Sequence, residues 1–204
     1  MAVSFRYESR LKKRGFKLIA GIDEAGRGPL AGPVVAAAVI LPSSARIKGL
    51  NDSKKLTPGK RERLYSQIIK KATSFGIGIV NEKDIDRINI LNATHLAMRH
   101  AVQRLEVTPD YLIIDGKRRI KTLDFPRQMI PSGDSMSSSI AAASIIAKVT
   151  RDRMMKSFDK EYPRYGFGRH MGYATKKHVR ALRKYGPSPI HRRSFEPVAS
   201  MRTC

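Results

Sequence analysis

The chain has 204 residues, of which 41% are hydrophobic, so it is long enough to form one domain with a sizeable core. No apolar run approaches the ~18 to 20 residues of a membrane span, and the single cysteine, Cys204, excludes an internal disulfide and a cysteine zinc site. Its 40 Lys and Arg against 17 Asp and Glu give a formal charge of +23, which favours a polyanionic partner, above all nucleic acid. A lysine-rich surface that serves solubility, or a ribosomal type of structural protein, would share this composition.

Residues 1–15 are basic and weakly patterned, and we expect a short helix or a mobile arm there. Two apolar runs follow, at residues 18–22 and 34–41, and the Gly- and Pro-rich segment between them is unsuited to a helix. These runs predict a hairpin-like pair of core strands.

Asp23 and Glu24 follow the first apolar run. Side chains alternate along a strand, so Asp23 should lie on the face opposite Ile22 and Glu24 on the same face as Ile22. The two acids can therefore serve one site only if the strand ends there, and Gly26 and Gly28 supply the backbone freedom for that departure. A polar strand end followed by an ordinary loop would look the same, whereas the glycine spacing does not match a dinucleotide-binding loop.

Helical and strand patterns alternate through the middle of the chain. Thr57 and Pro58 predict the start of a helix over residues 58–71, and residues 74–80 alternate as in a strand. An apolar stripe over residues 88–105 predicts an amphipathic helix, on which we expect His95 to be a core or rim residue. Further elements are expected as strands at 111–116 and 127–130 and as helices at 140–156 and 175–184.

Three basic stretches could contact phosphate. Lys54 and Lys55 lie in a polar turn that suits a phosphate contact, although a solvated loop has the same composition. Residues 164–173 interleave aromatics, glycines and cations, a pattern that fits base or sugar stacking, or else a turn with core aromatics. From Lys148 onward 15 Lys and Arg stand against 4 Asp and Glu, so we expect the C-terminal part to grip a nucleic-acid strand, with a loose tail after residue 195.

Two further acids repeat the pattern of the first strand. Asp115 ends an apolar run beside Gly116, and Asp134 lies in or just before a helix cap, where it could merely favour the helix dipole. If these acids converge with Asp23, two carboxylates ~4 Å apart repel by roughly 4 kcal/mol at an effective dielectric of about 20, and divalent cations relieve that repulsion. Oxygen ligands favour Mg²⁺ or Mn²⁺ over Zn²⁺, and two such ions on a basic protein indicate phosphodiester chemistry.

Several segments resemble ribonuclease HII, the type 2 ribonuclease H of bacteria, in order from about residue 16 to residue 195. The two most specific are GIDEAGRGPLAGPVV at 21–35 and SIAAASIIAKVTRD at 139–152; the others are DSKKL at 52–56, IDG at 114–116, GD at 133–134, YGF at 165–167 and GY at 172–173. The resemblance implies an α/β fold of the ribonuclease H type, a mixed β-sheet flanked by helices with a C-terminal helical region. We expect a basic N-terminal arm at 1–15, a catalytic core at 16–160, and a substrate-binding helical region with a tail at 161–204 that forms one structural unit with the core.

The resemblance also implies an activity. It implies hydrolysis of RNA in RNA/DNA hybrids and incision 5′ to a single ribonucleotide in duplex DNA, leaving 3′-hydroxyl and 5′-phosphate ends, by a cytoplasmic monomer that does not bind membranes. The implied metal-binding and catalytic acids, for two Mn²⁺ or Mg²⁺ ions, are Asp23, Glu24, Asp115 and Asp134. The implied substrate contacts are Gly26, Arg27 and Gly28, which read the 2′-hydroxyl, Tyr173, which stacks on the sugar, and Lys54, Lys55, Arg169 and His170.

Two departures from the family pattern stand out. Met136 and Met171 lie where we expect lysine in many relatives, so some phosphate grip is lost, and Arg169 and His170 would replace it. The loop at 26–28 and the lack of an N-terminal substrate-binding extension argue against the related ribonuclease HIII. Two alternatives stay open: a non-catalytic basic protein, which would bind nucleic acid under chelator without nicking it, and another nuclease of the same fold, such as a junction resolvase.

Overall fold

The computed structural model describes residues 3–117 and 123–201 of the chain. Its helices are α1 (Arg6–Lys13), α2 (Pro58–Lys71), α3 (Glu82–Gln103), α4 (Ser138–Glu161), α5 (Phe167–His170) and α6 (Lys176–Tyr185), with 3-10 turns η1 (Ser53–Lys55) and η2 (Gly133–Ser135). Its strands are β1 (Ile19–Ala25), β2 (Val34–Ile40), β3 (Ser74–Val80), β4 (Tyr111–Asp115) and β5 (Arg127–Ile130). Among the described residues, no helix is long and apolar enough to cross a bilayer.

The five strands form one mixed sheet in the order β3-β2-β1-β4-β5. β1 pairs with β2 in antiparallel fashion, which confirms the predicted hairpin, and β1 and β4 run parallel, with Ile22 beside Ile114. Parallel strands bring their carboxyl ends to the same edge of a sheet. The acids that end β1 and β4 are therefore carried to one edge by the strand order itself.

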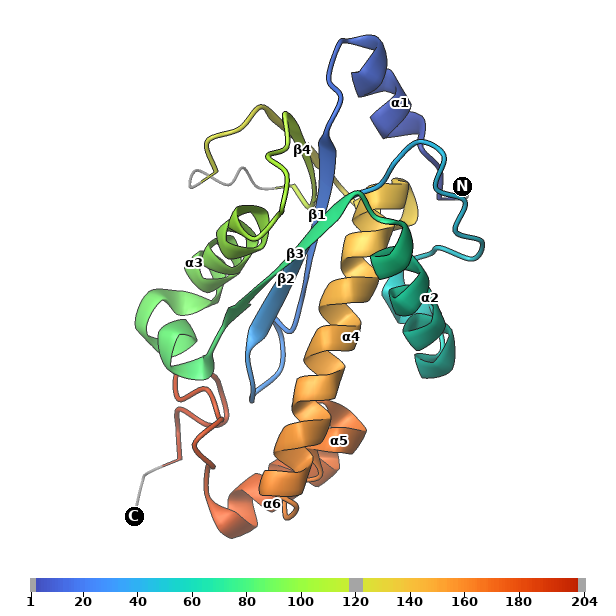
Figure 1. Ribbon diagram of the computed structural model, residues 1–204. Coiled ribbons are helices and arrows are strands. Elements are labelled where there is room, and N and C mark those ends of the chain that lie inside the picture. The colour runs from blue at the N-terminus through green and yellow to red at the C-terminus, as the bar shows by residue number, and fades with distance from the viewer. Residues whose placement is uncertain (1–2, 118–122, 202–204) are drawn as a thin grey trace.

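Helices cover both faces of this sheet (Figure 1). On one face α3 packs over β1, β2 and β3, and buries residues such as Ile22, Ala36 and Met98. On the other face α4 packs over β1 and β2 with α2 beside it, and buries Val35 and Ile146. The sheet is therefore apolar on both faces, as the continuous apolar runs of β1 and β2 require.

The C-terminal segments α5 and α6 lie at the end of α4 that is remote from α1 (Figure 1). Phe167, Met155 and Ile190 form a small apolar cluster that joins α5 to α4, and Leu182 of α6 packs with Leu30 and Val198. The C-terminal region therefore shares buried contacts with the core of the chain.

Most local expectations are confirmed at the level of single elements. Thr57 accepts a hydrogen bond from the Lys60 N–H and caps α2, which spans the predicted residues, and β3 and β5 also match their predicted ranges. The basic segment at the N-terminus forms α1, whose buried Glu8 accepts hydrogen bonds from the Ser137 hydroxyl and the Ser139 N–H. This helix is thereby attached to the first turn of α4.

Two expectations are wrong. Helix α3 begins at Glu82 rather than near residue 88, because Asn81 caps it, and a kink at Asn89 (φ 65°) joins two helical segments. The segment after residue 195 is not a loose tail in its described part, since Val198 is buried and packs with Leu30 and Leu182. His191 and Arg192, just before this segment, are also buried, because Ser188 and His178 bond to His191 and backbone carbonyls accept from Arg192.

Candidate active site

Asp23 and Glu24 lie near the carboxyl end of β1 but on opposite faces of the sheet. The strand ends one residue later, at Ala25, and Gly26 then begins the departure of the chain with a φ of 95°. Asp23 faces α4, where it interacts with the Ser144 hydroxyl, and Glu24 borders a cavity beneath α3. The pair therefore straddles the sheet edge.

Burial and mutual repulsion raise the pKa values of these acids. Asp23 is only 5% exposed, and its pKa is raised well above the ordinary value first by burial and then by the charges of Glu24 and Asp115. Burial also raises the pKa of Glu24, although the nearby Arg27 guanidinium, 3.2 Å from Glu24 Oε1, opposes the shift. The three carboxylates therefore act on one another in a shared field.

Asp134 approaches the same field from η2. The Gly133 N–H donates to Asp115 Oδ1 at 2.7 Å, which ties the end of β4 to the turn that carries Asp134. Asp134 is 7% exposed, and burial, then the charges of Asp52 and Asp115, raise its pKa. All four predicted acids are thus linked through Asp115, which is the electrostatic neighbour of each of the others.

Lys54 supplies positive charge to this cluster, while Asp52 adds a fifth carboxylate. Although burial lowers the pKa of Lys54, the surrounding acids raise it overall, Asp52 first and then Asp23, Asp134 and Asp115. The Asp52 side chain accepts the Lys54 N–H at 2.9 Å and so forms the cap of η1. Sequence reasoning passed over Asp52, whose position in the DSKKL turn is the only available signal.

The donor chemistry of the acids fits divalent cations, because the carboxylates are crowded oxygen donors, and burial, then the neighbouring carboxylates, raise the pKa values of Asp23 and Asp134. Within residues 3–117 and 123–201, no three His, Cys, Asp or Glu side chains are arranged as a ready cage for one ion. The acids are therefore electrostatic neighbours in this conformation without forming a closed ligand shell.

Two buried arginines shape the loop that follows β1. Arg192 is fully buried and donates to the carbonyl oxygens of Gly26, Arg27 and Gly32 at 2.5 to 2.9 Å. Arg151 likewise donates to three carbonyls nearby. Gly26 has a φ of +95°, and a β-carbon there would collide with the Arg151 side chain, so the loop requires glycine at this position.

Tyr173 stands beside this loop and is 45% exposed. A β-carbon at Gly28 would lie 3.8 Å from Tyr173 Cε1, so the ring and the loop form adjacent walls. The Tyr173 carbonyl accepts a hydrogen bond from His178 Nδ1 at 2.9 Å. The structure therefore brings together the predicted 2′-hydroxyl loop and the predicted stacking tyrosine.

The histidine behind Tyr173 belongs to a directed hydrogen-bond chain. Ser188 donates its N–H to His191 Nδ1 at 2.9 Å, so His191 carries its hydrogen on Nε2 and donates to His178 Nε2 at 3.0 Å. Every group in the chain is satisfied when both imidazoles are neutral. Accordingly, burial lowers the pKa of His178 to about 4 and that of His191 to about 3.

The remaining predicted contacts lie outside the acid cluster. Lys55 borders a basic groove with Lys48, Lys60 and Arg63, and Arg169 borders another hollow beside α6. His170 accepts the Gly172 N–H at Nδ1 and donates from Nε2 to the Tyr165 carbonyl, so a phosphate contact would have to displace one of these bonds. The structure thus uses His170 within its own fold.

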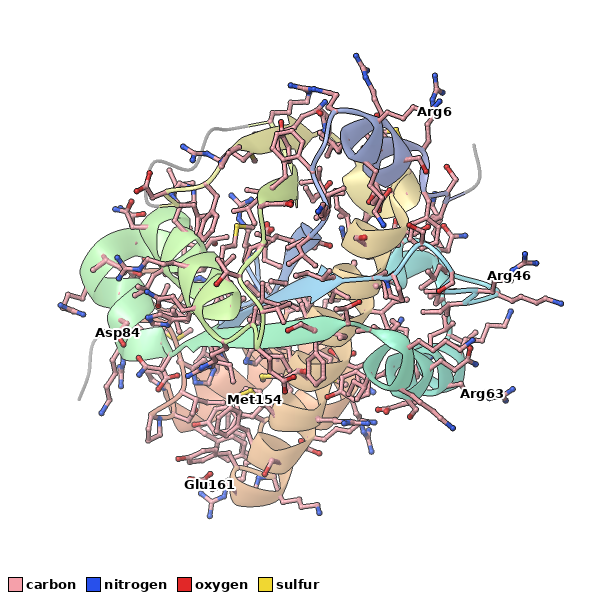
Figure 2. All side chains as sticks on the ribbon, turned by 45° about the horizontal axis from the view of Figure 1, so that its top comes forward. Arg6, Arg46, Arg63, Asp84, Met154 and Glu161 are labelled. Atoms are coloured by element: carbon pink, nitrogen blue, oxygen red, sulfur yellow. The ribbon has the colours of Figure 1, made fainter. Side chains whose placement is uncertain are left out.

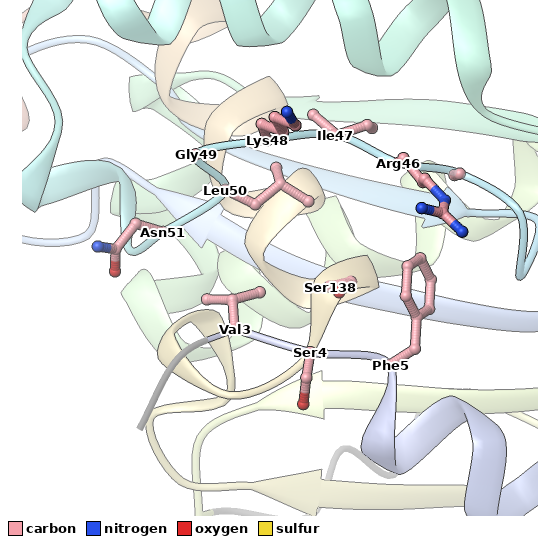
Figure 3. A pocket seen from close by; sticks show the side chains of 11 residues that line it. Val3, Ser4, Phe5, Arg46, Ile47, Lys48, Gly49, Leu50, Asn51 and Ser138 are labelled. Atoms are coloured by element: carbon pink, nitrogen blue, oxygen red, sulfur yellow. The ribbon is translucent and has the colours of Figure 1, made fainter.

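Positive charge also extends well beyond the C-terminal part of the chain. Figure 2 shows Arg6, Arg46 and Arg63 projecting outward around α1 and α2. Between these helices, residues 3–5 and the loop at 45–51 enclose a hollow of about 600 Å³, which none of the predicted site residues lines (Figure 3).

The two methionines found where lysine was expected pack into apolar surroundings. Met136 joins the cluster around Tyr7 and Phe16. Met171 packs beside Phe167 in a left-handed conformation, with a φ of 51°. Both side chains therefore support the fold at positions next to the site.

The strand order, the two helical layers and the acidic sheet edge define a nuclease of the ribonuclease H fold. The ribonuclease HII family model matches residues 20–198. Ribonuclease HII of Acetivibrio thermocellus is 60% identical over 189 residues, covering 93% of this chain and 73% of that protein, and the Geobacillus kaustophilus protein is 57% identical over 193 residues, covering 95% and 74%. The crystal structure of ribonuclease H2 from Pyrococcus horikoshii OT3 superposes with a TM-score of 0.76 at 30% identity, covering 90% of this chain and 96% of that one.

The chain belongs to the ribonuclease HII family. It is accordingly a ribonuclease H, an endonuclease that hydrolyses phosphodiester bonds. The family resemblance and the fold class inferred from the sequence are confirmed.

Proposed function

We propose that this ribonuclease H hydrolyses the RNA strand of RNA/DNA hybrids and incises duplex DNA 5′ to a single embedded ribonucleotide, leaving 3′-hydroxyl and 5′-phosphate ends. The observation that carries the proposal is the position of the Gly26–Gly28 loop and Tyr173 beside four neighbouring carboxylates. A nuclease acting on any phosphodiester would need only the acids. A loop and an exposed ring at the same site provide a means of reading the sugar.

In this proposal Asp23, Glu24, Asp115 and Asp134 hold two divalent cations, Mn²⁺ or Mg²⁺. When bound, such ions activate water and stabilise the in-line transition state. Their positive charge also relieves the repulsion that raises the carboxylate pKa values in the metal-free protein. Lys54, already inside the field of these acids, is placed to contact a substrate phosphate.

The loop recognises the ribose through its backbone. The carbonyl oxygens of Gly26 and Arg27 are occupied by Arg192. Within the described parts of the chain, the N–H groups of Arg27 and Gly28 have no hydrogen-bond acceptor. Donors left free beside the acids suit a 2′-hydroxyl, the group that distinguishes RNA from DNA.

The C-terminal region at 161–204 contributes the substrate-binding surface. Tyr173 projects its exposed ring from this region, and Arg169 lines a hollow with Arg164, Lys176 and Lys177. These cations suit the phosphates of a duplex that extends away from the cleaved bond. We expect the protein to act as a cytoplasmic monomer, which fractionation and size-exclusion chromatography would check.

The test uses three end-labelled duplexes of one sequence: all DNA, DNA with one ribonucleotide, and an RNA/DNA hybrid, each with Mn²⁺, with Mg²⁺ or with chelator. We expect incision of the second and third duplexes only when a metal ion is present, with the cut in the second duplex 5′ to its single ribonucleotide. Tyr173→Ala should reduce cleavage of the single-ribonucleotide duplex more than that of the hybrid, which offers many 2′-hydroxyls. If the wild type cuts all-DNA duplex equally well, or binds every duplex and never nicks one, the proposal is wrong.

A further inference from the structure

A cavity of about 340 Å³ lies beneath α3 and opens beside the acid cluster. Glu24 and Asp115 border it on the side of the reaction centre, and Arg27 borders it from the loop after β1. Asp23, on the other face of the sheet, does not line it. The cavity is therefore continuous with one half of the candidate active site.

Helix α3 presents His95 to this cavity because of the kink at Asn89. The Asn89 side chain accepts the Asn92 N–H at 3.1 Å and so caps the second helical segment. Leu91, His95 and Met98 follow at helical spacing and form the face of this segment that lines the cavity. The kink thus sets the direction of the helix that carries His95.

The imidazole of His95 has no hydrogen-bond partner among the described residues, whereas His170, His178 and His191 all have partners. Burial, and then the charge of Arg27, lower the pKa of His95. A neutral imidazole retains one N–H donor. His95 therefore brings an unused donor to a cavity that the candidate catalytic acids also border.

The lining of the cavity fits a nucleotide better than an apolar ligand. Leu91, Met98 and Met129 supply apolar surface, while Arg27 and Lys117 supply positive charge at the rim. A sugar can lie against the methionines while its phosphate meets N–H donors and cations. The bordering Glu24 and Asp115 place this nucleotide next to the bond that is cut.

We propose that this cavity is a substrate subsite and that His95 donates a hydrogen bond to a phosphate of the cleaved strand beside the scissile one. The proposal rests on the proposed function, since it assumes the same strand and the same acids. It adds a contact from α3 to those expected from the loop at 26–28 and from the C-terminal region. The sequence gives no signal for it, because a histidine on an apolar helical stripe is ordinarily a core or rim residue.

The test compares His95→Ala, His95→Gln and His100→Ala in the full chain. His100 lies on the same helix but does not line the cavity, so it is the matched control. Each protein is assayed on duplexes that carry one neutral methylphosphonate at successive positions around the cleavage site. A thermal melt of each variant checks that it is folded.

We expect His95→Ala to lower kcat/KM by roughly 10-fold or more, as for a lost hydrogen bond to a charged group, and His95→Gln to restore most of the loss. One methylphosphonate position should slow the wild type and not slow His95→Ala further. His100→Ala should match the wild type on every duplex. An unchanged His95→Ala, or a loss that is the same at every methylphosphonate position, would overturn the proposal.

The outcome is separable from that of the proposed function. If the wild type cleaves the hybrid but never a single-ribonucleotide duplex, the finer substrate assignment fails. The His95 comparison then runs on the hybrid, where the same position-specific loss is expected.

Discussion

Arg192→Met should destabilise the protein and disorder the loop that follows β1. In the wild type, one fully buried guanidinium makes four hydrogen bonds to the carbonyl oxygens of Gly26, Arg27 and Gly32. Methionine keeps the apolar stem but leaves three carbonyls, those of Gly26 and Gly32 buried and that of Arg27 partly so, without their donor, at about 1 to 3 kcal/mol each. The relief of an unfavourably buried charge offsets part of this loss, since burial already lowers the pKa of Arg192 to about 9.

The net change should be about 3 to 5 kcal/mol in the free energy of unfolding, a large share of the ~5 to 15 kcal/mol of a typical domain. Arg192→Lys should lose less, because an ammonium keeps the charge but cannot span three carbonyls as a planar fork does. If Arg192→Lys folds, the misplaced loop should lower incision at a single ribonucleotide by roughly 10- to 100-fold.

Urea unfolding, followed by circular dichroism, measures the free energy of unfolding. The rate of single-turnover incision reports whether the loop is correctly placed. Arg193→Gln is the matched control, because Arg193 is the exposed neighbour whose backbone N–H, not its side chain, bonds to Asp86. It should change stability by less than about 0.5 kcal/mol. An Arg192→Met protein as stable as this control, or an Arg192→Lys protein with wild-type incision, would refute the reasoning.

Three further changes have defined outcomes. Asp134→Asn should reduce incision more than about 100-fold while leaving the metal-free protein at least as stable, because a buried charge is removed. The incision assay and a urea titration in chelator check the two effects. Full turnover by this variant would exclude the assigned role. The folded-state pKa values of His178 and His191 lie below the unfolded value of about 6.5, so the unfolded chain binds more protons below that pH. The free energy of unfolding should therefore fall as the pH drops from about 6.5 towards 4, by up to ~1.4 kcal/mol per pH unit for each histidine. Urea midpoints at several pH values should show this slope, and His191→Gln should flatten it. Gly21→Ala should destabilise by roughly 1 to 3 kcal/mol, since the new β-carbon meets backbone of α4, whereas Gly59→Ala in open space should be neutral or stabilising in the same melts.

Local signals predicted much of the fold, because each was read from neighbouring residues. The Thr57 cap, the alternation in β3 and the apolar run that ends at Asp115 all act over a few positions, and the structure places each element accordingly. The alternation along β1 also put Asp23 and Glu24 on opposite faces correctly. The strand then ends at Ala25, and Asp115 from the parallel neighbour reaches the field of both acids.

The errors have a common physical cause, which is long-range satisfaction of polar groups. Arginine side chains are ordinarily exposed, yet carbonyls more than a hundred residues away enclose Arg192, and a second histidine meets the buried His191. Asn89 similarly acts as both the break and the cap of α3, a combination that periodicity does not reveal. His95 was placed on the correct face, but the cavity under that face depends on β4 and β5.

These long-range contacts hold the residues that would recognise the sugar separately from the acidic centre. The acids lie at the carboxyl ends of β1 and β4 and on η2, while Arg192 and the His178–His191 pair hold the loop and the Tyr173 backbone from the C-terminal side. Among the described residues, no hydrogen bond joins that C-terminal set to the side chain of a site acid. The loop itself meets the acids through the Arg27–Glu24 ion pair. Changes in the C-terminal set should therefore alter sugar discrimination before they alter metal affinity, and Arg27 is the residue at which the two properties should change together.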